Sequence, residues 1–119
     1  MKIAITSKGR GLDSEVDPRF GRAAYILIID TETLEFEVID NAKNANAFKG
    51  AGIQAAASIS EKNAQVLLTG FCGPNAFKIL DAAGIKVASD LMGTVRDAVK
   101  NFNKGKLSFT SAANVEGHW

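Results

Sequence analysis

The sequence predicts an α/β fold built around one five-stranded mixed sheet, and three observations lead to this expectation. Two apolar runs, at 23–30 and 34–40, are joined by only three residues, which is typical of an antiparallel hairpin. After Asn41, helical and strand patterns alternate, and strand–helix–strand units favour parallel strands with right-handed crossovers. A chain of 119 residues that is 46% hydrophobic also suits one domain with its own core. We therefore expect the strand order 3-2-1-4-5, with helices packed on the faces of the sheet.

The first three expected strands differ in how they are covered. The segment 2–6 is short and rich in β-branched residues, and 23–30 is almost continuously apolar, as in a strand buried on both faces. The segment 34–40 alternates apolar residues with glutamates, which indicates a half-exposed strand whose charges discourage edge-to-edge pairing. The hairpin should therefore end the sheet on one side.

The first helix is expected over 50–62, an alanine-rich segment that places Ile53, Ala56 and Ile59 on one side. This side should lie on the sheet. A buried strand is expected directly afterwards, at 64–70.

A second helix is expected between two residues that commonly mark helix ends. Pro74 suits a first helical position, and Gly84 stands just past the expected end. Between them, Phe77, Leu80 and Ala83 share one face, which should be buried.

A fifth strand at 85–89 and a third helix complete the regular pattern. Thr94 stands three residues before Asp97, as in a capping box, and Gly105 closes the helix. The residues expected to be buried on this helix are Val95, Ala98, Val99 and Phe102.

A long loop rich in glycine and charge separates the strands at 2–6 and 23–30, and connections beyond about 12 residues tend to be functional or disordered. In such sheets, ligands bind beyond the carboxyl ends of parallel strands where the winding changes direction. This loop and the segment GFCGPNAF, 70–77, should converge there. Together they offer glycine amides, a helix N-terminus and the cations Lys8, Arg10, Arg19 and Arg22. These groups suit an anionic ligand.

The same residues have a plainer interpretation as solvated charges and turn glycines. Asp13, Glu15 and Asp17 would then partly neutralise the arginines. A calcium loop is disfavoured, because Pro18 and Ala24 stand where it needs glycine and glutamate. Nucleotide binding is unsupported, because no glycine pair ends in Lys-Ser/Thr and no G-x-G-x-x-G opens a helix.

Composition restricts the partners and the compartment. A net charge of +1 gives no overall field for capturing nucleic acid or an anionic membrane. The start MKIAITSKGRG turns polar too soon for a signal peptide, and no run approaches the roughly 20 apolar residues of a membrane span. With one cysteine and therefore no internal disulfide, we expect a cytoplasmic protein without nucleic-acid or membrane partners.

The candidate metal ligands are Cys72 and His118. For Cys72, a small buried side chain between strand and helix is the favoured role, and metal ligation is the alternative. We predict a single domain at 1–107 and a partly disordered C-terminal tail at 108–119. His118 and Trp119 would share that disorder, unless the tail folds back and supplies an imidazole and an apolar cover.

Three further side chains are expected mainly in the core. Phe20 and Phe71 flank the basic residues and glycines, and core packing is favoured for each over lining a ligand site. Met92 is expected to fill the core rather than to act as a thioether ligand.

Four segments in this order resemble one known family: LDSEVDPRFGRAAYILIID, KGAGIQAAASI, LLTGFCGPNAFKILDAAGIKV and GTVRDAVKNFNKGKL. The family is that of dinitrogenase iron-molybdenum cofactor biosynthesis. It includes NifX-type proteins, the C-terminal domain of NifB-type proteins, and the small orange proteins that carry a molybdenum-copper-sulfide cluster. The resemblance extends to about Leu107, and the single domain makes the orange proteins the nearest type.

The resemblance implies a three-layer, ribonuclease H-like fold and a function without catalysis. Family members bind preassembled metal–sulfur clusters as carriers, escorts or stores, so the implied cargo is a molybdenum-copper-sulfide or related molybdenum-iron-sulfur cluster. A carrier also implies protein partners for delivery or signalling. Where the family often has a histidine before a Phe-Gly pair, this chain has Arg19, which favours capture by charge and hydrogen bonds over ligation.

Residue reasoning and the resemblance together give one set of candidate cluster-binding residues. They are Arg10, Arg19, Phe20, Gly21, Arg22, Gly70, Phe71, Cys72, Gly73, Pro74 and Asn75. Two other function classes stay open. One is a protein-interaction or regulatory module of the same fold without a cluster. The other is a metal-dependent hydrolase, which is disfavoured because the segment 2–6 carries no carboxylate.

Overall fold

Five strands form one mixed sheet in the order β3-β2-β1-β4-β5 in the computed structural model, which describes residues 1–42 and 50–110. The strands are β1 (Lys2–Ser7), β2 (Tyr25–Asp30), β3 (Phe36–Asp40), β4 (Val66–Leu68) and β5 (Lys86–Ala88), and the helices are α2 (Ala51–Glu61), α3 (Pro74–Ala82) and α4 (Val95–Asn103). β1 pairs antiparallel with β2 and parallel with β4. The predicted strand order is confirmed.

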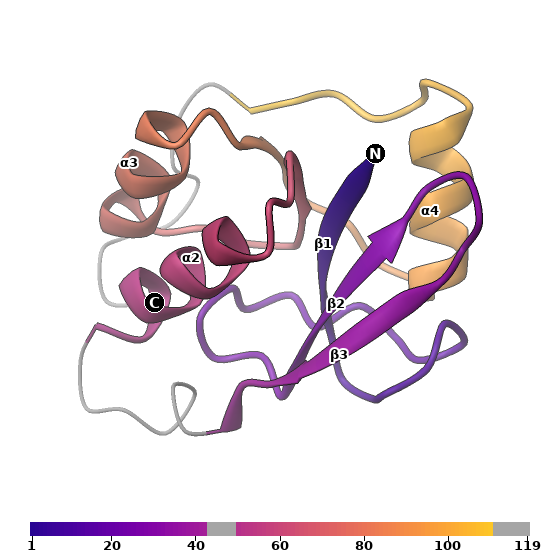
Figure 1. Cartoon of the computed structure of the whole chain (residues 1–119), viewed down its shortest axis with the longest axis horizontal. Coiled ribbons are helices and arrows are strands. Elements are labelled where there is room, and N and C mark those ends of the chain that lie inside the picture. Colours follow the sequence, from indigo (N-terminus) through magenta and orange to yellow (C-terminus); the bar gives the residue numbers. More distant parts are fainter. Residues whose placement is uncertain (43–49, 111–119) are drawn as a thin grey trace.

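The helices cover both faces of the sheet, which gives three layers. Figure 1 shows α2 and α3 on one side and α4 on the other. Because successive side chains of a strand point to opposite faces, Ala4 of β1 packs in the core under α2 and α3. Ile3 and Ile5 pack in the second core, with Val95 and Val99 of α4. This layering is the one expected of the ribonuclease H-like fold.

The predicted inner face of α2 is wrong at Ile53, which is 39% exposed. The face that is buried consists of Ala51, Gly52, Ala55, Ala56 and Ile59. The reason is that the long loop approaches α2 closely at Gly21, where an added Cβ would lie 2.7 Å from the Cα of Gly52. Only very small side chains permit this spacing, so the alanine and glycine stripe faces inward and Ile53 faces out.

The helix α3 has the predicted ends but a narrower buried face. Pro74 is its first residue, and Gly84, with φ +76°, follows its end. Leu80 is buried and Phe77 is half-buried, as expected. Ala83 is exposed, contrary to expectation, because it is the C-cap residue where the chain already turns away.

The helix α4 follows its prediction closely. The Thr94 hydroxyl oxygen accepts a hydrogen bond from the backbone N–H of Asp97 at 3.1 Å, which confirms the predicted cap. Val95, Ala98 and Val99 are buried, and Phe102 packs against them.

The prediction that Met92 fills the core is wrong, because its exposed fraction is 86%. Met92 lies in the turn between β5 and α4, beside Asp90 and Gly93, which both have positive φ values, of 63° and 94°. This tight turn holds the side chain outside both core layers.

The chain after α4 returns along the edge of β5. The backbone N–H of Thr110 donates to the carbonyl of Val87 at 2.7 Å. The predicted tail, 108–119, therefore begins with residues that contact the sheet. His118 and Trp119 lie outside the described residues.

Candidate functional site

The two segments predicted to converge do meet at the carboxyl ends of β1 and β4. The backbone N–H of Phe71 donates to the carbonyl of Pro18 at 2.6 Å, and the N–H of Phe20 donates to the carbonyl of Phe71 at 3.1 Å. These bonds form a short parallel bridge around Arg19 and Phe71. We call residues 17–22 and 70–75 together the loop junction. In Figure 1 the long loop after β1 runs below the sheet, on the side where β1 ends.

Two glycines of the loop junction allow the protein to pack closely against itself. A Cβ added at Gly70 would lie 2.6 Å from the Cα of Pro18. Gly21 has φ +91° and packs against Gly52 at the start of α2. Any side chain at either position would separate the two segments, or the loop and α2. Their conformational freedom therefore builds the site.

Three buried polar residues form the base of the loop junction. The Thr6 hydroxyl donates to the backbone carbonyl of Asp17 at 2.6 Å, and the N–H of Asp17 donates to the carbonyl of Thr6 at 3.0 Å. The hydroxyl oxygens of Thr6 and Thr69 are 2.8 Å apart. The carboxyl ends of the two central strands, at Thr6 in β1 and Thr69 just after β4, are thus tied to each other and to the loop. Sequence reasoning missed both threonines, although a hydroxyl at the end of each of two apolar strands was a usable signal.

A buried carboxylate contacts one of the predicted arginines. The side chain of Asp17 is 4% exposed, whereas that of Arg19 is 51% exposed. Oδ1 of Asp17 accepts the backbone N–H of Arg19 at 3.1 Å and lies 3.6 Å from its Nε. This pair confirms that Asp17 partly neutralises the loop arginines.

Asn41 fixes the second half of the same loop and was not predicted as a site residue. Its buried Nδ2 donates to the carbonyl of Gly21 at 3.0 Å and to that of Ala23 at 2.9 Å. Its backbone N–H donates to the carbonyl of Ala24 at 3.0 Å. The end of β3 therefore holds the chain that carries Arg22.

The first half of the long loop, which we call the loop arm (residues 8–16), pairs its charges on the surface. Nζ of Lys8 lies 3.4 Å from a carboxylate oxygen of Glu15. Nε of Arg96 on α4 donates to Asp13 at 2.8 Å, and this hydrogen bond holds the pKa of Asp13 below its usual range. Arg10 stands over the ring of Tyr25, 5.1 Å from its centroid. Asp13 and Glu15 thus neutralise Arg96 and Lys8 rather than the loop arginines, which corrects that expectation.

The N-terminus of α3 adds partial positive charge to the loop junction. No side chain caps it at Gly73, and its first turn contains no acidic residue. Pro74 lacks an N–H, and Asn75 beside it is exposed. A helix N-terminus carries about half a positive charge, which adds to the charges of Arg19 and Arg22. Two acidic residues border the same place: Asp17 beside Arg19, and Asp90, whose backbone N–H donates to the carbonyl of Gly70 at 2.8 Å. The arrangement can hold a small anion.

Several predicted residues lie beneath this surface rather than on it. Phe20 is 1% exposed and belongs to the core under α2 and α3, which confirms the favoured role. The core role favoured for Phe71 is wrong, because this side chain is half-buried at the surface of the junction and belongs to neither core cluster. Among the predicted residues of the loop junction, those that reach the surface are Arg19, Arg22, Phe71, Pro74 and Asn75.

Cys72 is fully buried, as the favoured interpretation predicted. Its Sγ lies 3.7 Å from the carbonyl oxygen of Gly73, and burial raises the pKa of the thiol to about 12. The thiol is therefore protonated at neutral pH, and metals bind the thiolate. This environment fits direct ligation by Cys72 poorly.

Within residues 1–42 and 50–110, no three His, Cys, Asp or Glu side chains gather closely enough to hold a metal ion. The other predicted ligand, His118, lies outside these residues. What the described residues offer at the loop junction is cations, amides and apolar surface.

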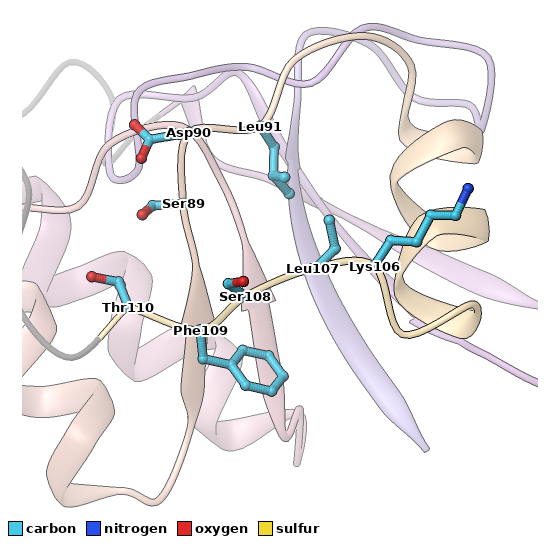
Figure 2. Close-up of a pocket in the computed structure, with 8 residues that line it drawn as sticks. All are labelled: Ser89, Asp90, Leu91, Lys106, Leu107, Ser108, Phe109 and Thr110. Atoms are coloured by element: carbon cyan, nitrogen blue, oxygen red, sulfur yellow. The ribbon is translucent and has the colours of Figure 1, made fainter.

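A separate hollow of about 270 Å³ lies on the β5 edge. Figure 2 shows it between the turn at Ser89–Leu91 and the returning chain at Lys106–Thr110. A second hollow, of about 400 Å³, shares Phe109 and Thr110 with it. Neither is lined by any of the predicted site residues, and sequence reasoning did not anticipate them.

Comparison with known proteins identifies the family. The model of the dinitrogenase iron-molybdenum cofactor family matches residues 1–105. The chain belongs to this family. Its match covers both segments of the loop junction and all the described helices and strands.

Solved structures of similar proteins agree with the membership in the dinitrogenase iron-molybdenum cofactor family. The apo form of the orange protein from Desulfovibrio gigas is 47% identical, covers 96% of each chain and superposes with a TM-score of 0.93. A candidate NifB protein from Thermotoga is 39% identical over 98% of each chain, with a TM-score of 0.83. In a comparison of sequences alone, an uncharacterized protein from Methanocaldococcus jannaschii is 27% identical, and the match covers 90% of this chain and 89% of that protein.

Proposed function

We propose that this protein binds and carries an anionic, molybdenum-containing metal–sulfide cluster at the loop junction, without catalysing a reaction. The observation that carries the proposal is the meeting of the segments around Arg19 and Phe71, next to an α3 N-terminus that no side chain caps. The family and the resemblance to the orange protein support a cluster as the anion. The metals would be molybdenum with copper, as in the orange proteins, or molybdenum with iron.

The chemistry of the junction suits such a cargo. A thiometallate is a multiply charged anion with a soft sulfide surface that accepts N–H hydrogen bonds and tolerates apolar neighbours. Arg19 and Arg22 would supply charge and donors, and Phe71 and Pro74 apolar contact. Sulfide bridges already complete the coordination of the metals, so few protein ligands are needed. Because the protein would supply few ligands, it could also release the cluster.

The remaining predicted residues would act from below or from a distance. Gly21, Gly70 and Gly73 would shape the junction, and Phe20 and Cys72 would support it from the core. Arg10, held over Tyr25 in the loop arm, would attract the anion without touching it. We further propose cytoplasmic carriage and delivery to a protein partner. None of the described helices has the length and apolarity that crossing a bilayer requires.

Titration with tetrathiomolybdate, with and without copper, tests the proposal under anaerobic conditions. We expect visible absorbance that stays with the protein through gel filtration. Arg19→Ala and Arg22→Ala should each weaken binding by about tenfold at low ionic strength, and less at high salt because salt screens charges. Arg96→Ala, the same charge change in the pair with Asp13, is the matched control and should bind normally.

Two results would contradict this account. One is that no colour is retained by the wild-type protein. The other is that Cys72→Ser abolishes binding while both arginine variants bind normally, which would make the thiolate the anchor.

An interaction module without a cluster is the second candidate function. The observation that favours it is that Lys8, Arg19 and Arg96 are already paired with carboxylates. Partner capture that is insensitive to Arg19→Ala and Arg22→Ala, from protein without metal, would support it over cluster carriage.

A further inference from the structure

We propose that Asp17 is a positioning residue: its buried carboxylate orients the guanidinium of Arg19 for an anionic ligand. The inference rests on the proposed function and adds a role for a residue whose own charge opposes anion binding. Its side chain is 4% exposed and lies beside that of Arg19, which is 51% exposed.

The backbone of Asp17 is fixed by the ends of β1 and β4. The single proton of the Thr6 hydroxyl is donated to the carbonyl of Asp17 at 2.6 Å. Thr69 must therefore be the donor in the 2.8 Å contact between the two hydroxyls. Together with the N–H of Asp17 donating to Thr6, these bonds allow no separate movement of Asp17 and the strand ends.

Because Asp17 is held in place, the backbone of Arg19 and the carboxylate beside its side chain both have fixed positions. Oδ1 of Asp17 accepts the backbone N–H of Arg19 and lies 3.6 Å from Nε. A guanidinium has five N–H donors in one plane, so engaging the Nε edge leaves the two Nη groups for a ligand. An arginine ordered before binding loses less side-chain entropy when the ligand arrives.

Charge and positioning predict opposite effects for Asp17→Asn. The substitution removes a negative charge close to the ligand, so Coulomb attraction alone would tighten anion binding. It also removes the charge that attracts Nε to Oδ1 across 3.6 Å, so positioning predicts weaker binding. Asparagine keeps the size of the side chain and an Oδ1 that accepts the N–H of Arg19, which confines the change to the charge.

The first measurement is the affinity for tetrathiomolybdate, followed by visible absorbance. We expect Asp17→Asn to weaken binding about two- to fivefold, the usual range for the loss of one partly exposed ion pair. The matched control is Glu15→Gln, which removes an acid of the same loop that is 71% exposed and paired with Lys8. It should bind as tightly as wild type or slightly more tightly. An Asp17→Asn variant that binds like Glu15→Gln would overturn the proposal.

A double-mutant cycle with Arg19→Lys gives a second test. Lysine keeps the charge at this 51% exposed position, which makes a folding defect improbable, but it has no Nε edge to be oriented. We expect the single variant to lose affinity, and Asp17→Asn to cause no further loss in its background. Losses that simply add would mean that Asp17 acts independently of Arg19, and would contradict positioning.

A measurement without ligand separates failure of this inference from failure of the proposed function. In ¹⁵N-labelled protein, the Nε–H signal of Arg19 should exchange with water more slowly in the wild type than in Asp17→Asn. If the wild type does not bind tetrathiomolybdate, the proposed function fails while this signal still tests the orientation. If the signal is unchanged in Asp17→Asn, positioning is wrong even where binding is intact.

Discussion

The two halves of the long loop use the same residue types in different ways. In the loop arm, charges pair side by side on the surface, as Lys8 does with Glu15. In the loop junction, the acidic partner is buried and hydrogen-bonded at the strand ends, as Asp17 is below Arg19. Exposed pairs contribute little and are screened by salt, whereas a buried partner fixes geometry. The contrast supports the proposal that the ligand binds at the junction and not at the arm.

Gly21 in the junction and Gly11 in the arm differ in the same way, and replacing Gly21 should give the largest effect on stability. Gly21→Ala would place a Cβ 2.7 Å from the backbone of Gly52, at φ +91°. We expect a loss of about 3 kcal/mol or more in the free energy of unfolding, from backbone strain and steric overlap. Gly11→Ala in the arm meets no atom within 4 Å and should change it by less than about 0.5 kcal/mol. Urea denaturation of both variants measures the difference, and equal losses would remove the distinction.

The effect expected from the pH dependence of the buried thiol in the junction is smaller for each pH unit. Burial raises the pKa of Cys72 from an ordinary 9.0 to about 12, so between these values the unfolded chain releases a proton that the folded protein keeps. Stability should therefore fall as pH rises above 9.0, by up to about 1.4 kcal/mol per pH unit. Cys72→Ala lacks this proton and should show a shallower fall. Parallel curves for the two proteins would mean that the thiol is not buried in this way.

The smallest effect is expected in the arm. The hydrogen bond from Arg96 lowers the pKa of Asp13, and both groups are solvent-accessible. Arg96→Ala should return the pKa of Asp13 toward its usual value, as measured by an NMR titration, and leave the urea unfolding curve unchanged. A marked loss of stability would show that the arm is as structurally important as the junction.

Much of the fold followed from local patterns. The three-residue link after 23–30 and the later alternation of helices and strands were sufficient for the strand order. The inner face of α2 was not predictable, because it depends on the contact between Gly21 and Gly52, which lie on separate elements. The position of Met92 was predicted wrongly for a similar reason, because a turn with two positive φ angles directs its side chain outward.

The position of the site in the fold was predictable from the sequence, but the contacts between its residues were not. Strand order alone indicated that the loop and the segment after β4 would converge. The pairing of Asp13 with Arg96, which is 83 residues away, and of Thr6 with Thr69, which is 63 away, depends on the finished fold. For this reason the sequence could name the cations and Asp17, but not the threonines that hold Asp17 at the strand ends.

The most direct test of the central claim is elemental analysis with a visible spectrum on protein purified anaerobically from its native source. The account predicts molybdenum, with copper or iron, at a fixed ratio to protein, together with visible colour. Colourless, metal-free protein that also fails to retain tetrathiomolybdate would contradict cluster carriage and favour the interaction module.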